Sequence, residues 1–73
     1  MQKSRFRGPL PGNLREVLFE IMKVGHALRV TAIDPDSGTE VTMVADPRAT
    51  DAEIKRLAAR KLWYVIQKNT GKT

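Results

Sequence analysis

The chain has 73 residues, a formal net charge of +5 and no cysteine. This length allows one small domain, which buries only about 60% of the surface of its unfolded chain. The lack of cysteine excludes disulfide bonds, a thiolate nucleophile and thiolate metal ligands. No apolar run approaches the roughly 20 residues of a membrane-spanning helix, and no signal peptide follows the basic N-terminus, so we expect a cytoplasmic protein without a membrane partner.

The first thirteen residues, MQKSRFRGPLPGN, contain two prolines and two glycines and show no periodic pattern of apolar residues. This composition is typical of an irregular segment, so residues 1–13 are expected to be a flexible basic arm. A single domain is expected over residues 14–70, and a short C-terminal tail over residues 71–73.

Three segments after the arm alternate apolar and polar residues, which is the pattern of half-buried strands. They are VLFEIMK from Val17, ALRVTAID from Ala27 and TEVTMVA from Thr39. The segments VGH and PDSG separate them and supply turn residues, with Gly25 able to adopt a positive φ. The sequence therefore predicts an antiparallel meander.

The register of this meander follows from the faces of the strands. Pairing Asp34 with Thr39 across the second turn places each inward apolar residue opposite another one. Across the first turn, the same reasoning places Glu20 beside Arg29, an opposite-charge pair on the outer face. One face of the meander is then apolar, and a helix is expected to cover it.

The last regular segment begins with TDAE, a capping box in which Thr50 and Glu53 exchange hydrogen bonds. At about 100° per residue, the following apolar residues share one face of a helix. The fold is therefore predicted to be α+β, a three-stranded antiparallel β-meander followed by one C-terminal α-helix packed on one face (β-β-β-α).

Two residues of this helix do not fit its two faces. Lys61 falls inside the apolar arc, where its stem can pack while its ammonium group reaches solvent past the sheet edge; a buried reactive lysine is the alternative. Trp63 falls on the polar side, where it can stack on a base or anchor a partner. The other interpretation is that the tail or the chain end folds over Trp63, or that the helix is rotated.

The residues that catalysis or metal binding requires are not grouped. His26, the single histidine, lies in a predicted turn without a partner. The segment DPDSG looks like the start of a calcium loop, but Ala45 occupies the position of the bidentate acid. No glycine-rich phosphate loop occurs. We therefore expect a protein that is not an enzyme, with no cofactor, metal or small-molecule substrate.

The stretch LFEIMKVGHALRVTAIDPDSGTEVTMVADP, followed by RLAARKLWYVIQK, resembles a family of short uncharacterised proteins, mostly proteobacterial. The shared features are the FE, VG, AID and EV pairs or triplets of the core and the helix pattern A-x-RKL-x-YV. The resemblance covers residues 18–68. It implies a stand-alone domain of unknown function and carries no activity or site residue.

The sequence is consistent with two functions. The first is a protein-interaction or self-association module, expected as a homodimer or with a protein partner, because an uncovered sheet face this apolar exceeds what a monomer normally exposes. Its predicted surface consists of Leu18, Met22, Ile33, Val44 and Trp63. The alternative is weak, sequence-tolerant nucleic-acid binding by the basic arm and helix. Its predicted contacts are Lys3, Arg5, Arg7, Arg15, Arg56, Arg60 and Lys61.

Overall fold

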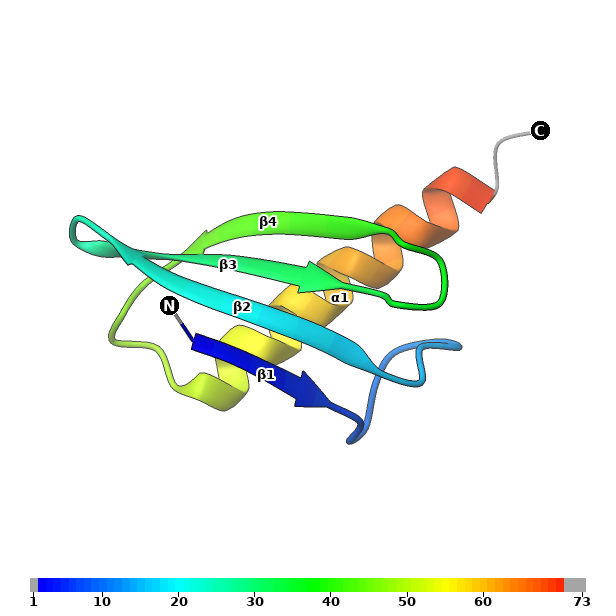
Figure 1. The fold of residues 1–73 in the computed structure, drawn as a ribbon, viewed down its shortest axis with the longest axis horizontal. Helices are drawn as coiled ribbons and strands as arrows, with labels where there is room; N and C mark the ends of the chain where they lie inside the picture. Colours follow the sequence, from blue (N-terminus) through cyan, green and yellow to red (C-terminus); the bar gives the residue numbers. More distant parts are fainter. Residues whose placement is uncertain (1, 71–73) are drawn as a thin grey trace.

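The computed structural model describes residues 2–70, and the predicted tail over 71–73 lies outside the described residues. The elements are β1 (Gln2–Phe6), β2 (Val17–Val24), β3 (Ala27–Ile33), β4 (Glu40–Ala45) and α1 (Asp51–Thr70). The strands form one antiparallel sheet in the order β1-β2-β3-β4, and α1 crosses one face of it diagonally (Figure 1). The α+β class and the single C-terminal helix on an antiparallel sheet are therefore confirmed.

The prediction of three strands was wrong, because the sheet has four. The additional strand, β1, lies in the segment that was expected to be a flexible arm, and it pairs with β2 along its length. Apolar periodicity missed it, since Phe6 is the only apolar residue in QKSRF. Ladder hydrogen bonds hold β1 instead, together with a Lys3–Glu20 ion pair at 3.6 Å and the packing of Phe6 on Phe19, whose ring centroids are 6.4 Å apart.

The turn between β3 and β4 has the predicted register. The Asp34 amide donates a hydrogen bond to the Thr39 carbonyl at 2.9 Å. The Asp34 carboxylate is buried and organises the turn, because it accepts hydrogen bonds from the Asp36 amide at 3.0 Å and the Ser37 hydroxyl at 2.8 Å. A short polar side chain that bonds to the following backbone is a common way to form such a turn.

The register between β2 and β3 differs from the predicted one by two residues. Met22, rather than Glu20, lies opposite Arg29. The reason is the length of the turn: β2 continues to Val24, so only two residues connect the strands, and the first of them, Gly25, has φ of 62°. Two-residue hairpin loops favour such a glycine. A shift by two residues keeps every side chain on its face, so the face assignment was still correct.

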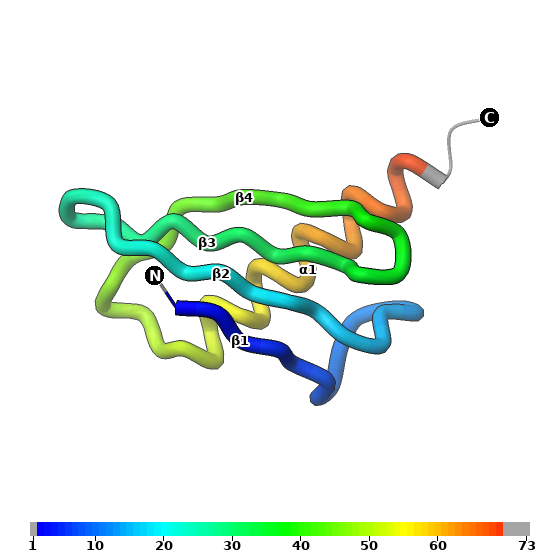
Figure 2. Tube along the Cα trace, in the orientation of Figure 1, coloured from blue at the N-terminus to red at the C-terminus, as the bar shows by residue number. Residues whose placement is uncertain are grey.

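The core lies between the inner face of the sheet and α1. The helix packs mainly against β3 and β4, and its last turns extend beyond the sheet (Figure 2). The buried apolar residues are Val17, Phe19, Ile21, Val30, Ala32, Val41, Ile54, Ala58, Ala59 and Leu62. Within residues 2–70, no helix covers the opposite, outer face of the sheet.

The predicted capping box begins α1. The Thr50 hydroxyl accepts a hydrogen bond from the Glu53 amide at 3.1 Å, and the Glu53 carboxylate accepts one from the Thr50 amide at 3.2 Å. The hydrogen bonds from the Thr50 amide and then the Thr50 hydroxyl hold the pKa of Glu53 below its ordinary value, with a smaller contribution from the charge of Arg56. Asp51 and Lys55, four residues apart in the first turns of α1, form an ion pair at 2.9 Å.

Candidate functional site

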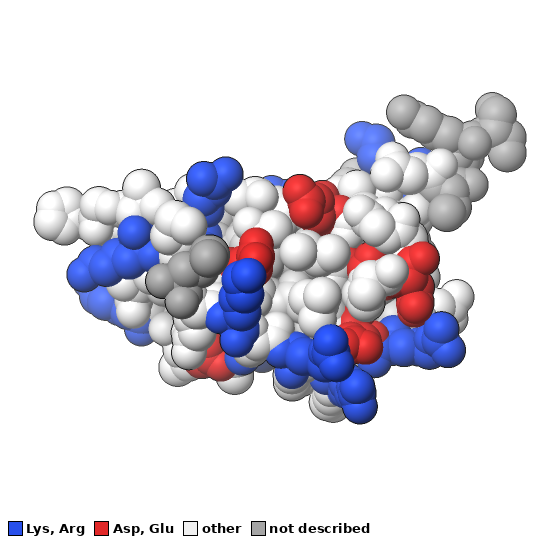
Figure 3. Space-filling model, in the orientation of Figure 1, with Lys and Arg blue, Asp and Glu red and all other residues white. Residues whose placement is uncertain are grey.

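The outer face of the sheet is built from every second residue of its strands. The observed register arranges these residues in three rows that run across the strands. From one end of the sheet to the other, the rows are Arg5, Leu18, Ile33 and Glu40; then Lys3, Glu20, Thr31 and Thr42; then Met22, Arg29 and Val44. In Figure 3, which views the molecule from the sheet side, uncharged side chains occupy the middle of this face, with acidic and basic groups around them.

Four of the five residues of the predicted interaction surface share this outer face. Leu18 and Ile33 are paired neighbours and are half-buried, whereas Met22 is 39% exposed and Val44 is 73% exposed. Val24, which is 53% exposed, extends the apolar area at the end of β2. Sequence reasoning missed Val24 because it assigned VGH to the turn; the alternation that places Met22 outward would also have placed Val24 there if the strand had been extended.

The structure separates the fifth residue, Trp63, from the sheet face. Its side chain lies on α1 and is half-buried under the loop that connects β1 to β2. Gly12 of this loop has φ of 58°, and a Cβ atom there would lie 2.0 Å from Cε2 of the indole. Trp63 is therefore covered, but within the described residues the cover is the loop of residues 7–16 and not the tail or the chain end.

The helix is also rotated relative to the predicted core face. Ala59 is 2% exposed and belongs to the core, whereas Leu57 and Tyr64 of the same helix are 47% and 63% exposed. The loop of residues 7–16 lies against the Trp63 side of α1, and Leu57 and Tyr64 face solvent. Leu57 and Tyr64 are thus the exposed apolar residues of the helix, and they lie apart from the sheet's outer face.

Lys61 lies at the edge of the sheet, as predicted for a snorkelling lysine. The residue is exposed, and its ammonium group donates a hydrogen bond to the Thr42 carbonyl of β4 at 3.3 Å. This carbonyl therefore points away from β3, along the free edge of the sheet. A lysine at an edge strand is a common obstacle to pairing with another strand.

The other basic residues of the predicted polyanion surface are dispersed. Arg7 lies in the connecting loop, and Arg56 and Arg60 lie on α1. The remaining three form ion pairs, Lys3 with Glu20, Arg5 with Glu16 and Arg15 with Asp36. These six residues do not form one continuous basic groove, because they are divided among the sheet, the loop and the helix.

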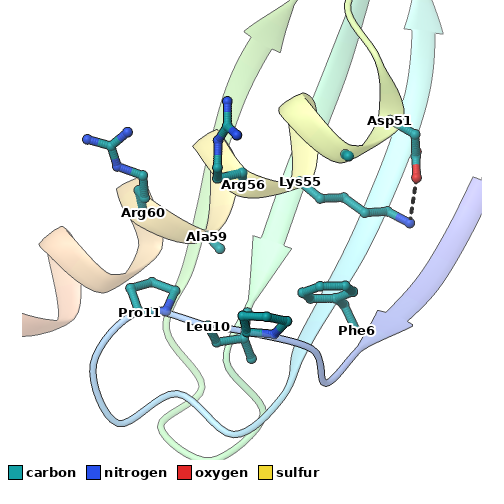
Figure 4. A pocket seen from close by; sticks show the side chains of 10 residues that line it. Phe6, Leu10, Pro11, Asp51, Lys55, Arg56, Ala59 and Arg60 are labelled. Atoms are coloured by element: carbon teal, nitrogen blue, oxygen red, sulfur yellow. Dashed lines mark ion pairs between the residues drawn. The ribbon is translucent and has the colours of Figure 1, made fainter.

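A cavity of about 400 Å³, which the sequence did not predict, lies between residues 6–11 and α1. Phe6, Leu10 and Pro11 face the helix across it (Figure 4). The stem of Lys55 lies above Phe6 and its ammonium group points to Asp51. Apolar contacts made by a proline-rich loop have no periodicity, so no sequence pattern could have indicated this cavity.

The described part of the chain has no group of three or more His, Cys, Asp or Glu side chains that could hold a metal ion. Between residues 2 and 70 there is also no helix that is long and apolar enough to cross a membrane.

A family model for a domain of unknown function, DUF6898, matches residues 14–69. The chain belongs to this family. The matched residues of the DUF6898 domain include β2, β3 and β4 and nearly all of α1, whereas β1 and residues 7–13 lie outside the match. No curated protein and no solved structure matches the chain. The family description assigns no function, so a function must be inferred from the surfaces described above.

Proposed function

We propose that this DUF6898 domain is a non-enzymatic module that self-associates through the outer face of its sheet. The observation that carries the proposal is the first row of that face, in which the half-buried pair Leu18 and Ile33 lies between Arg5 at one edge and Glu40 at the other. Opposite charges at opposite edges make the row complementary to a second copy of itself. An isologous dimer requires this property of its interface.

The complementarity defines one orientation of the two copies. A two-fold axis that lies between the sheets, parallel to the strands and midway between β2 and β3, places β1 of each copy over β4 of the other. Leu18 then lies over Ile33 of the second copy, and Arg5 lies over Glu40 of the second copy. Arg5 also pairs with Glu16 of its own chain through Nε. Its terminal guanidinium nitrogens are the groups that would reach Glu40.

Face packing has more support than pairing of sheet edges. At the β4 edge, the Lys61 ammonium group donates a hydrogen bond to the Thr42 carbonyl, which points outward from the sheet. The other edge, β1, is five residues long and carries Lys3 and Arg5. Short edge strands and edge cations both disfavour the addition of another strand.

The size and polarity of the face favour a weak, reversible dimer. Four strands about 4.8 Å apart and about 3.3 Å per residue give a face of roughly 20 Å on each side. Packing two such faces would bury roughly 1,000 Å² in total, the lower end of the range for specific interfaces. The middle row, with the Lys3–Glu20 ion pair and two threonines, would also have to be partly desolvated.

Sedimentation velocity over a concentration series is the test. At about 100 μM the wild-type chain, of 8.2 kDa, should sediment largely as a dimer and should dissociate on dilution. The double variant Met22→Glu/Val44→Glu should remain monomeric, because it places carboxylates on the proposed interface. The matched control Leu57→Glu/Tyr64→Glu changes two exposed apolar residues of the helix and should dimerise like the wild type.

A wild-type chain that remains a monomer at about 100 μM would contradict self-association. A chain whose dimer is disrupted by the helix variant but not by the sheet variant would contradict the proposed face. Circular dichroism of both variants checks that they are folded, which is expected because all four positions are already exposed.

Nucleic-acid binding, the alternative function, has less support. Three of its predicted basic contacts are engaged in ion pairs, Lys61 is bonded to β4, and Trp63 is half-buried under the loop. Stacking on a base would require the indole face that the loop covers. Binding of single strands through Arg7, Arg56 and Arg60 alone would be weak and strongly dependent on salt.

A further inference from the structure

We propose that the cavity between residues 6–11 and α1 is a binding site for a small anionic amphiphile, a free molecule with one carboxylate on an apolar body. The site lies on the helix side of the molecule and shares no residue with the apolar residues of the outer sheet face. The inference is therefore independent of self-association.

The walls of the cavity are apolar on both sides. The side formed by the loop consists of Phe6, Pro9, Leu10 and Pro11, and the side formed by the helix includes Ala52 and Ala59. The two alanines leave the space open, because longer side chains at these positions would project into it. Phe6 is held by its packing on Phe19, so the wall nearest the sheet is supported by the core. An apolar cavity with few polar groups is the usual form of a small-molecule site.

The charges around the cavity are complementary to an anion. Asp51 is the one acidic residue that lines it, and Asp51 is paired with Lys55. Arg56 and Arg60 line the same cavity from the helix, and within residues 2–70 no ion pair involves either guanidinium group. In Figure 4 both guanidinium groups point away from Leu10 and Pro11, so to bind an anion these two flexible side chains would turn toward the rim of the cavity. A carboxylate at the mouth can be bound by these groups while the apolar body enters the cavity.

The size of the cavity suits a small ligand. A volume of about 400 Å³ lies near the lower end of the range of roughly 300–1,000 Å³ for small-molecule sites. A medium-chain fatty acid or an aromatic carboxylate has the required combination of one charge and an apolar body. We use decanoate as the probe, below the concentration at which it forms micelles.

The loop provides its own reporter. The cavity is lined by Pro9, Leu10 and Pro11 of the loop. The next residue, Gly12, contacts the indole of Trp63, which is the only tryptophan in the sequence. A ligand that displaces the loop residues should therefore alter the packing on Trp63. Tryptophan emission and isothermal calorimetry give two independent measurements of binding.

The test compares ligands and then variants. Decanoate should bind and change the Trp63 emission, whereas decyltrimethylammonium, which has the same chain and a positive charge, should not. Ala52→Phe, at an exposed helix position that lines the cavity, should weaken decanoate binding about tenfold or more by filling the space. The double variant Arg56→Gln/Arg60→Gln should weaken it about fivefold.

Two matched controls locate the binding. Arg29→Gln removes an exposed arginine from the sheet face and should leave the affinity unchanged. Met22→Glu/Val44→Glu, which should block self-association, should also bind decanoate like the wild type. A wild-type chain that gives neither an emission change nor a calorimetric signal overturns the proposal. Equal binding of the cation, or unchanged binding by both the Ala52 and the double arginine variants, overturns it as well.

Discussion

Gly12 meets two requirements that no other residue type satisfies together. Its φ of 58° is in the left-handed region, and its Cα lies so close to Trp63 that an added Cβ would be 2.0 Å from the indole. The first requirement concerns backbone strain, and the second concerns space. Gly25 has a similar φ of 62°, but nothing lies within 4 Å of the position of its Cβ. The two glycines therefore allow strain and steric conflict to be measured separately.

Gly12→Ala is expected to destabilise the domain by about 1–3 kcal/mol more than Gly25→Ala, which carries only the conformational cost of about 1 kcal/mol. The added methyl group must displace either the loop or the indole, so the Trp63 emission should shift to longer wavelength. Thermal unfolding and fluorescence of both variants measure the two effects. Equal losses of stability and an unchanged emission spectrum would mean that the loop does not pack on Trp63.

At the scale of the element, α1 depends on the capping box at its first turn. The Glu53 carboxylate accepts hydrogen bonds from the Thr50 amide and from the Thr50 hydroxyl, the latter at 3.0 Å. These bonds favour the ionised carboxylate and lower its pKa in the folded state. Such a group stabilises the fold above the pKa of the unfolded chain, and the stabilisation is lost as the pH falls through the folded pKa.

We therefore expect the stability difference between the wild type and Glu53→Gln to depend on pH. At neutral pH the wild type should be the more stable protein, because its charged carboxylate is the stronger acceptor. The difference should decrease as the pH is lowered from about 5 through the depressed pKa of the folded state, because the wild-type carboxylate becomes protonated there and the glutamine does not change. Urea unfolding across this range measures it. A difference that is constant with pH would show that the charge on Glu53 does not contribute.

At the scale of the whole molecule, the outer sheet face presents a charge at each end of its first row. In the proposed dimer, the two-fold axis brings Arg5 of each copy to Glu40 of the other, so the same pair occurs twice. Glu40→Arg should weaken the dimer about fivefold to tenfold, because two attractive pairs become repulsive. The double variant Arg5→Glu/Glu40→Arg should recover most of this loss. Because Arg5→Glu also breaks the ion pair with Glu16 of the same chain, thermal unfolding of the double variant checks that β1 remains in place.

Asn13→Arg is the control for this experiment, since it adds positive charge in the exposed connecting loop, away from the sheet face. It should leave the dimer unaffected. Sedimentation equilibrium at low salt, where charge pairs are least screened, gives the dissociation constants. Failure of the double variant to recover affinity would contradict the proposed orientation of the two copies, although not dimerisation through the face itself.

The features that local sequence predicted correctly depend on short-range chemistry. The capping box joins residues three apart, the turn after Asp34 joins residues five apart, and the strand faces follow from alternation. In each case the residues that interact are close in the chain. The predicted register between β2 and β3 was wrong by two residues. Any shift by an even number of residues keeps each side chain on its face, so the alternation of apolar and polar residues does not distinguish these registers. Only the length of the turn decides among them.

The sequence by itself thus determined the α+β class, the central meander, the start of the helix and the apolar residues of each sheet face. Tertiary structure decided the rest: the fourth strand, the rotation of α1, the cover over Trp63 and the cavity beside it. These features depend on polar or irregular segments that gain their positions from contacts with distant residues, such as Phe6 with Phe19 and Gly12 with Trp63. Periodicity reflects burial within one element, and it contains no information on which loop fills the space beside that element.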